Sequence, residues 1–524
     1  MKANRMVKVA LAAVALIGTA ILNTSGSQVY YSGQAGANPW ETVDRWNKYM
    51  ADGGGPLGWV PTLNDTVLIN ASTLSAEAGR ALEINSGVNA EALKFACGYQ
   101  NFAGSAHLKL NGGTLTSSTD VVIGQYYRGL ATLESGRIYC SQNFIVGENG
   151  PSGYGTVTNT AATIDAIRMR LGYTSGSYGK LVHLGGALTC RWDYSSFLVG
   201  YNGGVGEFEA NAGFTTKIMT IGGCSTNPPQ PCGTGTVTVA ENVSGYVRDY
   251  LKVANGTLNM RGGTIYLNNE FAADYGNLAT NLYVQTESNG IATIKGWGTF
   301  RPTSETTVLR MIHNGKVVAD GEGVERDLNL NLIAVVNNTI NNGPEGDNGW
   351  YATNKGRILF PRTSQTFTGG KNYCLGDLNV KTNPDMVNSV GFAFTTGFNA
   401  MVRGGFCDAA RNDIPAGLPQ HLRPVGVWFI GAFKERVSMA DKISFDFVSL
   451  TFRYDQAQLR AIDTQLRLYR YDGTAWVKVG EGLPGGDHLI STTAPLPPVA
   501  YGDYNMGWFA LMAAGNNGTL ISIH

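Results

Sequence analysis

The stretch from Leu108 to Asn268 repeats one short, mostly apolar phrase that ends in glycine: Val122-Ile123-Gly124, Ile145-Val146-Gly147, Arg170-Leu171-Gly172, Leu198-Val199-Gly200 and Thr220-Ile221-Gly222. These glycines lie 23, 25, 28 and 22 residues apart. A second glycine opens a new strand-like phrase in each unit, as in Gly155-Thr156, and a third phrase such as Gly136-Arg137-Ile138 completes the unit. Three short strands joined by glycine corners, at a period in the low twenties, predict a solenoid.

Alternating residues such as Leu130-Ala131-Thr132-Leu133 give each strand one apolar face. One coil has too little area to bury that face, but a stack of coils about 4.8 Å apart encloses a continuous core. The predicted fold class is therefore all-β: a parallel β-helix (β-solenoid) followed by a C-terminal antiparallel β-sandwich. A β-sandwich or propeller built from regular hairpins is the alternative, although propeller blades repeat at about 40 residues.

The composition is that of an extracellular all-β protein. Charged residues make up 15% of the 524, whereas Gly contributes 69 and Tyr 24. The formal net charge is zero; residues 1–27 hold three basic and no acidic residues, so the remainder carries 36 basic against 39 acidic residues, or −3. The sequence shows no clustered basic run, and we expect no nucleic-acid partner.

The first residues have the pattern of an export signal. Lys2, Arg5 and Lys8 precede an apolar run from Val9 to Leu22, and small residues follow up to Ser27. This pattern predicts a signal peptide over residues 1–27 and an extracellular or cell-surface location. An uncleaved anchor helix is the alternative, but about 14 apolar residues are short for a bilayer. No later apolar run reaches 18 residues, so we expect no membrane insertion after cleavage.

The remaining chain divides into three predicted parts: an N-terminal solenoid cap (28–69), the solenoid repeats (70–361) and the C-terminal β-sandwich domain (362–524). The cap contains Trp40, Trp46 and Trp59, which we expect to cover the open end of the core; a tryptophan-lined sugar platform is the alternative. Beyond Pro361 the strands lengthen and lose the period. The expected strands are 389–395, 425–430, 443–454, 466–471, 475–479 and 507–512, with one short helix at 457–464.

The C-terminal part resembles a known family. Its phrases are Tyr454-Asp455, Leu466 to Gly473 with Trp476, and Gly507-Trp508-Phe509-Ala510-Leu511. They resemble the C-terminal β-sandwich of large secreted bacterial proteins that carry autotransporter-associated, passenger-type β-strand repeats. The resemblance implies a parallel β-helix, mostly with no assigned chemistry. The end of this sequence lacks the sorting tail that some such proteins carry, so the resemblance leaves the mode of anchoring open.

Seven cysteines in an exported chain predict some disulfides. Cys224 and Cys232 flank a short loop and form the best local pair, and Cys374 with Cys407 is a second expected pair. Cys97, Cys140 and Cys190 lie in the repeats, where cysteine also serves as a small buried residue. No CxxC spacing is present, so neither zinc nor a redox centre is expected.

The sequence also lacks the residue clusters of an enzyme. It has no Asp-Asp pair and none of the phrases that a resemblance to polygalacturonases or pectate lyases would require, and its six histidines are scattered. The densest acidic segment, Asp320 to Asp327, is expected to be a solvated turn. We therefore expect no catalytic residues, no metal and no cofactor.

These features favour a secreted structural or adhesive protein that acts through a rigid solenoid and self-associates through the solenoid ends. The alternative is a carbohydrate-binding or polysaccharide-degrading β-helix protein. Its candidate binding residues follow the glycine phrases and are expected to line one face, where a surface polysaccharide would stack on them. They are Tyr126, Tyr127, Tyr173, Tyr178 and Tyr201.

Overall fold

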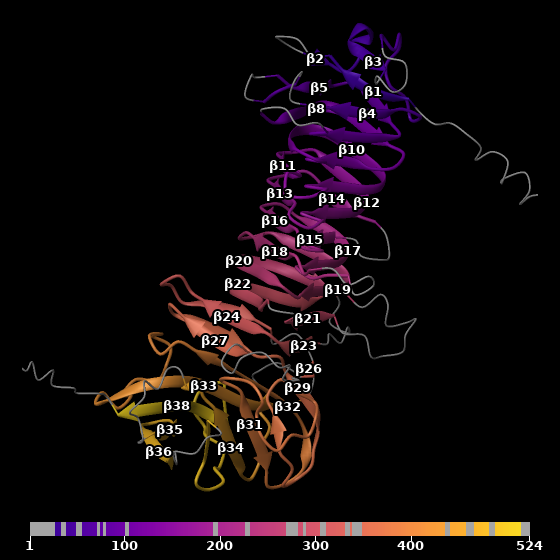
Figure 1. The fold of residues 1–524 in the computed structure, drawn as a ribbon. Coiled ribbons are helices and arrows are strands. Elements are labelled where there is room, and N and C mark those ends of the chain that lie inside the picture. Colours follow the sequence, from indigo (N-terminus) through magenta and orange to yellow (C-terminus); the bar gives the residue numbers. More distant parts are fainter. Residues whose placement is uncertain are drawn as a thin grey trace, which may run out of the picture.

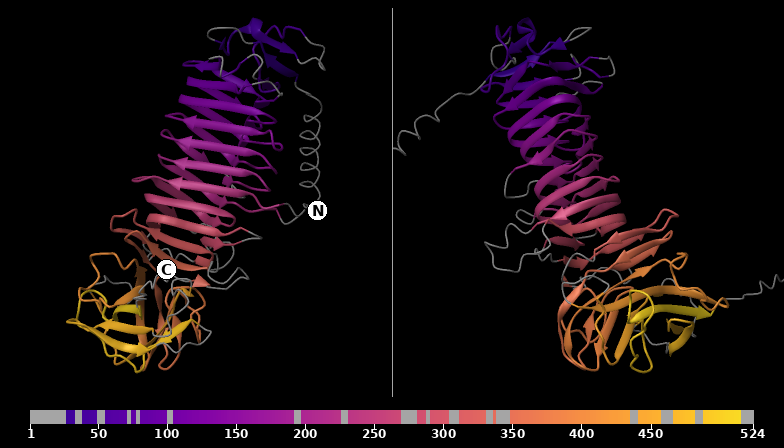
Figure 2. Two further views of the ribbon diagram at one scale, coloured as in Figure 1. Left: turned by 60° about the vertical axis from the view of Figure 1, so that its left-hand side comes forward. Right: turned by 180° about the vertical axis from the view of Figure 1, so that it is seen from behind.

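The computed structural model describes residues 27–32, 38–48, 55–70, 74–76, 80–99, 104–191, 197–225, 231–268, 281–286, 290–303, 311–330, 336–337, 348–434, 441–456, 466–481 and 488–514. Residues 1–26 of the expected signal peptide and the expected helix at 457–464 lie outside these ranges. The described chain forms a long stack of strands with a broader group of strands at its C-terminal end (Figure 1). Successive coils follow one another along the stack in both further views (Figure 2).

The first face of the stack, face 1, begins each coil after the apolar-glycine phrase. Its strands pair in parallel from one coil to the next. Face 1 contains β2 (Asn38–Pro39), β5 (Leu82–Asn85), the starts of β8 (Ala106–Ser117) and β10 (Arg128–Val146), β11 (Tyr154–Asn159), β13 (Tyr178–His183), β16 (Val205–Ala210), β18 (Thr234–Val239), the starts of β20 (Gly256–Leu267) and β22 (Ala292–Pro302), β24 (Lys316–Asp320) and β27 (Gly349–Thr353).

The second face, face 2, follows after a glycine corner and is also parallel throughout. It contains β6 (Asn89–Ala92), the end of β8, the middle of β10, the start of β12 (Thr163–Leu171), β14 (Leu188–Cys190), the starts of β17 (Phe214–Ile221) and β19 (Ser244–Val253), the ends of β20 and β22, β25 (Arg326–Asn329) and β28 (Gly356–Leu359).

The third face, face 3, closes the coil and ends in the apolar-glycine phrase. It contains β1 (Gln28–Tyr31), β4 (Thr66–Ile69), β7 (Lys94–Cys97), β9 (Val121–Ile123), the ends of β10 and β12, β15 (Phe197–Val199), the ends of β17 and β19, β21 (Leu282–Gln285), β23 (Met311–Asn314) and β26 (Val336–Asn337).

The core of the stack forms because every face turns alternate side chains inward. Strand β10 runs through all three faces and shows this within one coil: Leu133, Ile138 and Phe144 come from faces 1, 2 and 3, and each is fully buried. Their counterparts in neighbouring coils belong to the same hydrophobic cluster. No single coil encloses these residues, so their side chains become buried only when the coils stack on one another.

Two columns of glycine fix the corner between faces 3 and 1. Gly155 and Gly179 are register partners, and the column continues through Gly206 and Gly235. A Cβ at Gly179 would lie 1.9 Å from the carbonyl oxygen of Val146, so the backbones touch where a side chain would stand. The glycine that ends each apolar phrase has positive φ, 74° at Gly147, which turns the chain into the next coil.

An aromatic cluster covers the N-terminal end of the core. Strand β3 (Trp46–Lys48) pairs antiparallel with β1, after the 3-10 turn η1 (Val43–Arg45). Trp40 and Trp46 are buried with ring centroids 4.8 Å apart, and Trp46 Nε1 donates to the carbonyl oxygen of Trp40. Trp59 differs, since 48% of its surface is exposed, and Lys48 Nζ lies 5.8 Å from its ring centroid.

Beyond β28 the pairing becomes antiparallel. One group extends the stack's own sheet through β29 (Thr363–Phe367), β32 (Phe398–Cys407), β33 (Leu422–Phe433), β38 (Gly507–Ala514), β35 (Arg467–Tyr471) and β36 (Trp476–Glu481). A separate four-stranded sheet contains β30 (Tyr373–Cys374), β31 (Val390–Phe394), β34 (Val448–Arg453) and β37 (Leu489–Ser491). Phe452 of β34 contacts Trp428 and Phe509 of the first group, so aromatic side chains fill the space between the two sheets.

The structure therefore confirms an all-β chain with a parallel, solenoid-like sheet and a separate antiparallel sheet. The expected strand at 443–454 is shorter than its alternating pattern suggested, because β34 covers Val448–Arg453 alone. The expected strand at 425–430 is longer, since β33 runs from Leu422 to Phe433. In the described ranges no helix has the length and apolar character needed to span a membrane.

Candidate binding surface

The described residues contain no group of three or more His, Cys, Asp or Glu side chains placed to share a metal ion. The chemistry available on the stack is therefore that of its outward rows, in which one residue per coil stands directly above its register partner. Aromatic and arginine side chains recur in these rows, and we take these rows as the candidate binding surface.

Four of the five predicted binding tyrosines lie at the corner between faces 3 and 1. Tyr173 and Tyr201 occupy equivalent places in successive coils, with ring centroids 6.1 Å apart and planes 9° from parallel. Tyr126 is 41% exposed and meets Tyr99 edge to face at 5.5 Å, and Tyr127 beside it is half-buried. The corner thus carries two separate aromatic groups.

The fifth predicted tyrosine, Tyr178, lies at the start of face 1. It is the register partner of Tyr154, and their rings stack at 4.5 Å with planes 14° apart. The guanidinium of Arg128, the partner of Tyr154 in the preceding coil, lies 5.8 Å from the Tyr154 ring centroid. Burial and the neighbouring carboxylate of Glu207 raise the pKa of Tyr178, which keeps its hydroxyl protonated at neutral pH.

An arginine caps two further tyrosine pairs in the same way. The guanidinium of Arg170 lies 4.0 Å from the ring centroid of Tyr173, which stacks on Tyr201. On face 2, Arg301 lies 5.5 Å from the ring of Tyr266, which stacks on Tyr246 at 4.7 Å.

Each arginine cap supplies a cation–π contact, and each pair adds a ring–ring contact between coils. Both faces of Tyr173 are occupied in this way, one by the Arg170 guanidinium and the other by the Tyr201 ring.

A more polar group lies on face 2. Asp165 accepts from Arg137 Nη2 at 2.7 Å and forms an ion pair with Arg191 Nε at 2.5 Å. Both arginines also lie against the ring of Tyr139, at 5.3 and 4.4 Å from its centroid, and Arg191 Nη1 donates to the Tyr139 hydroxyl. One carboxylate thus pairs with two guanidinium groups, which leaves the group with one net positive charge, and the group joins three successive coils.

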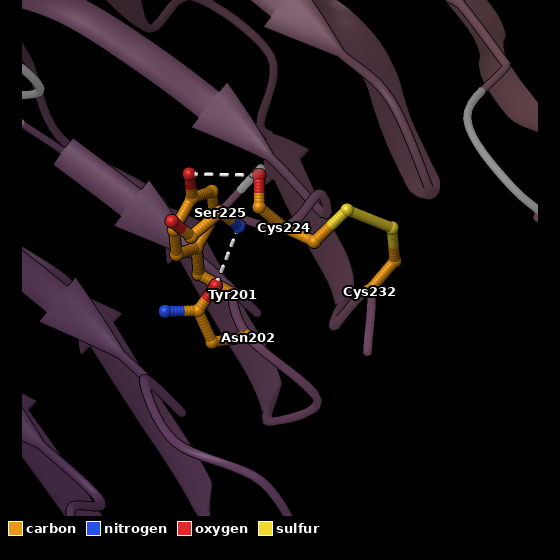
Figure 3. Close-up of a disulfide and its surroundings, with 5 residues drawn as sticks. All are labelled: Tyr201, Asn202, Cys224, Ser225 and Cys232. Atoms are coloured by element: carbon orange, nitrogen blue, oxygen red, sulfur yellow. Dashed lines mark hydrogen bonds between the residues drawn. A yellow bond between two sulfur atoms is a disulfide. The ribbon is translucent and has the colours of Figure 1, made fainter. Parts of the chain in front are cut away.

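The disulfide between Cys224 and Cys232 lies at the same corner as Tyr201 (Figure 3). The Tyr201 hydroxyl donates to the carbonyl oxygen of Cys224 at 3.0 Å, and the Ser225 N–H donates to Asn202 Oδ1 at 2.7 Å. These bonds attach the loop that begins at Cys224 to the preceding coil, and the bridge between Cys224 and Cys232 closes that loop.

The second expected disulfide is wrong: Cys374 and Cys407 are separate, buried thiols. Cys374 belongs to β30 in the four-stranded sheet, whereas Cys407 ends β32 in the other sheet. Cys407 packs with Val427 and Phe429 in a cluster that does not contain Cys374. The sequence offered two cysteines in one region but no signal for the sheet in which each would lie. Cys97, Cys140 and Cys190 are also buried free thiols.

The centre of the acidic segment is the exposed turn that the sequence predicted, with Glu322 and Glu325 both exposed, whereas the aspartates at its two ends are at least partly buried. Asp320 Oδ1 accepts from Asn354 Nδ2 at 3.0 Å and from the Glu322 N–H at 3.1 Å, and Lys295 lies 3.1 Å from its other oxygen. Asp327 accepts two bonds from Arg357. The partners come from neighbouring coils, so sequence spacing gave no sign of them. These carboxylates are structural acceptors.

Sequence reasoning found tyrosines near the glycine phrases but missed the arginines and tyrosines that complete the stacks. A usable signal was present: Tyr154-Gly155 and Tyr178-Gly179 place the same pair of residues at the same point of successive coils. Comparisons with protein-family models, with curated proteins and with solved structures found no match to this chain. The function is therefore argued from the geometry of the surface.

Proposed function

We propose that this chain is a secreted structural or adhesive protein of the cell surface or extracellular matrix, which acts by contact. In this proposal the parallel stack is a β-helix, the antiparallel strands form a β-sandwich, and no catalytic step is involved. The supporting observation is the single core that runs through three parallel faces from β1 to β28. A stack held by burial between all its coils is stiff along its length and offers long lateral rows for repeated contacts.

The two ends of the stack bear on self-association. At the C-terminal end of face 2, β28 pairs with β32, which closes the edge of that face. At the N-terminal end, β1 pairs with β3, but β6 on face 2 is hydrogen-bonded to β8 alone among the described strands. An unpaired strand edge is a template for another strand. We therefore place the proposed self-association at β6.

Carbohydrate is the second candidate partner. Tyr126 and Tyr154 are 41% and 42% exposed, and their edges and hydroxyls repeat along the stack. A glycan array would test this version with the variants Tyr127→Ala and Tyr201→Ala against the unaltered chain. Binding that is absent, or that neither substitution changes, would reject a role for this corner.

The main proposal is tested by expressing the full chain in a bacterial host and following its export. We expect secretion, with a mature N-terminus close to Gln28. Beads coated with the exported protein should adhere to polysaccharide-coated surfaces more strongly than albumin-coated beads. Sedimentation and electron microscopy should show rods that associate as concentration rises.

If the expressed chain stayed in the cytoplasm, the proposed extracellular location would be contradicted. An exported protein that stays a compact monomer at every concentration, and whose beads adhere no better than albumin beads, would remove the contact function. The variant Glu91→Pro on β6 separates the two modes of contact. It should abolish association between rods, because proline donates no hydrogen bond to an added strand, and leave bead adhesion unchanged.

A further inference from the structure

Two arginines on β12 point outward from face 3 and have neither a hydrogen-bonding nor an ionic partner among the described residues. Arg168 and Arg170 stand on the same side of the strand, two residues apart. Neither guanidinium has a hydrogen bond or an ion pair with any described residue, and the Nε atom of each is buried without a hydrogen-bond partner. The one close contact of Arg170 is the ring of Tyr173.

An arrangement of this kind is costly unless a ligand completes it. A buried N–H group without an acceptor loses its hydration and gains no hydrogen bond in return. Charged donors gain most from an anionic acceptor, and the planar guanidinium fork matches carboxylate and sulfate oxygens.

Two acidic residues that the structure describes nearby are already engaged. Asp165 on the same strand is held by Arg137 and Arg191. Glu148 in the preceding coil accepts from the side-chain amides of Gln125 and Asn149, each at 3.3 Å. Burial raises the pKa of Glu148, although the positive charge of Arg170 acts in the opposite direction. Among the described residues, the four arginines Arg137, Arg168, Arg170 and Arg191 thus outnumber the two carboxylates, Asp165 and Glu148.

The surface around the two guanidinium groups is apolar and aromatic. In register with Arg170 are Ile145, 1% exposed, in the preceding coil and Leu198, 5% exposed, in the following one. The Tyr173–Tyr201 stack lies at the adjoining corner. Apolar neighbours exclude water and strengthen charged hydrogen bonds to a bound group.

We propose that Arg168 and Arg170 form a binding site for the carboxylate or sulfate groups of an acidic polysaccharide. The inference rests on the proposed contact function and names its ligand. Two residues of a strand span about 6.6 Å, so the two forks present a pair of donors along the rod. A polymer with regularly repeated anionic groups engages both donors at once, whereas a single small anion engages one. The tyrosine edges beside them suit the hydroxyl groups of the same polymer.

The test measures the affinity of the exported full chain for heparin, a sulfated polysaccharide, and for polygalacturonate, a carboxylated one, with neutral dextran as reference. The double variant Arg168→Gln/Arg170→Gln should bind at least one acidic polymer at least tenfold more weakly. The double variant Arg261→Gln/Lys371→Gln removes the same charge from exposed positions farther along the chain. It should change affinity less than twofold.

Three further measurements decide between outcomes. Free sulfate or galacturonate monomer should compete weakly, at concentrations far above those of the polymer. Suppose that duplex DNA binds as tightly as the acidic polymers and that the Arg168→Gln/Arg170→Gln variant loses affinity for both to the same extent. That result would overturn the assignment to polysaccharide. Equal weakening in both double variants would overturn the site in favour of general charge. Bead adhesion that persists when acidic polymers fail to bind would reject this ligand and leave the contact function standing.

Discussion

Arg411 and Asp413 form a two-point ion pair, with Nε 2.8 Å from Oδ1 and Nη2 2.9 Å from Oδ2. Arg411 also donates to the carbonyl oxygen of Lys355, and Asp413 accepts a third bond from Arg357 of β28. The group therefore joins the last parallel coil to the loop after β32. Burial alone would raise the pKa of Asp413, but the hydrogen bonds and charge of Arg411 outweigh it and lower that pKa.

We predict that Arg411→Ala destabilises this junction by about 3 kcal/mol, because it removes one partner of a buried ion pair. The Arg411 side chain is 4% exposed, whereas Lys478, paired with Glu481, is 46% exposed. Lys478→Ala is thus the matched control and should cost less than about 1 kcal/mol. Thermal unfolding and limited proteolysis of the 408–413 loop would measure both. Similar effects of the two substitutions would contradict a structural role for the Arg411 group.

Gly179→Ala should destabilise the stack by about 3 kcal/mol. Its Cβ would lie 1.9 Å from the carbonyl oxygen of Val146 and 2.4 Å from the amide nitrogen of Gly172, both backbone atoms. Gly213 has an open corner position, with the nearest atom 3.4 Å away, so Gly213→Ala should be nearly neutral. Denaturant unfolding followed by circular dichroism would compare them. An unaffected Gly179→Ala protein would show that the coils are less closely packed than the structure indicates.

The glycine corners explain why the parallel stack was predictable. A corner with positive φ and close backbone contact admits glycine and few other residues, so Gly147 and its equivalents mark each coil directly in the sequence. The alternating apolar residues of β10 then indicate which side faces the core. Both signals are local, and each repeats at every coil.

The lateral contacts were not predictable in the same way. Arg357 meets Asp327 from the preceding coil and Asp413 from a loop 56 residues later. Such partners depend on the exact number of residues in every coil, and the spacing of the glycine phrases varies between 22 and 28. The free guanidinium groups of Arg168 and Arg170 raise the same difficulty, because a missing partner has no sequence signature.

Thiol counting tests the corrected disulfide assignment. In the folded protein the five free cysteines are buried, and burial raises the pKa of Cys97 to about 12, so alkylation at neutral pH should be slow. After unfolding without a reductant, mass spectrometry should find five alkylated cysteines, with Cys224 and Cys232 unmodified. Reduction should then expose all seven. Three alkylated cysteines before reduction would restore a second bridge and contradict the separation of Cys374 from Cys407.

The C-terminal part of the stack also predicts a pH-dependent stability centred on His313. This side chain is fully buried on β23, with its ring centroid 4.2 Å from that of Trp350, and burial lowers its pKa to about 3. Its unfolded pKa is about 6.5, so the unfolded chain binds the proton more readily. The stability contributed by neutral His313 is therefore present above about pH 6.5 and falls as pH is lowered toward 3. Between pH 7 and pH 4.5 the expected loss is about 2.5 kcal/mol.

His313→Leu should remove that part of the pH dependence. The buried His183, whose pKa burial also lowers, remains in both proteins and cancels from the comparison. Unfolding free energies at pH 7 and pH 4.5 would give the two slopes. The variant is expected to lose about 2.5 kcal/mol less than the unaltered chain over this interval, whatever its absolute stability at pH 7. Parallel slopes would mean that His313 is solvated or protonated in the native protein, which is incompatible with its place against Trp350 in the core.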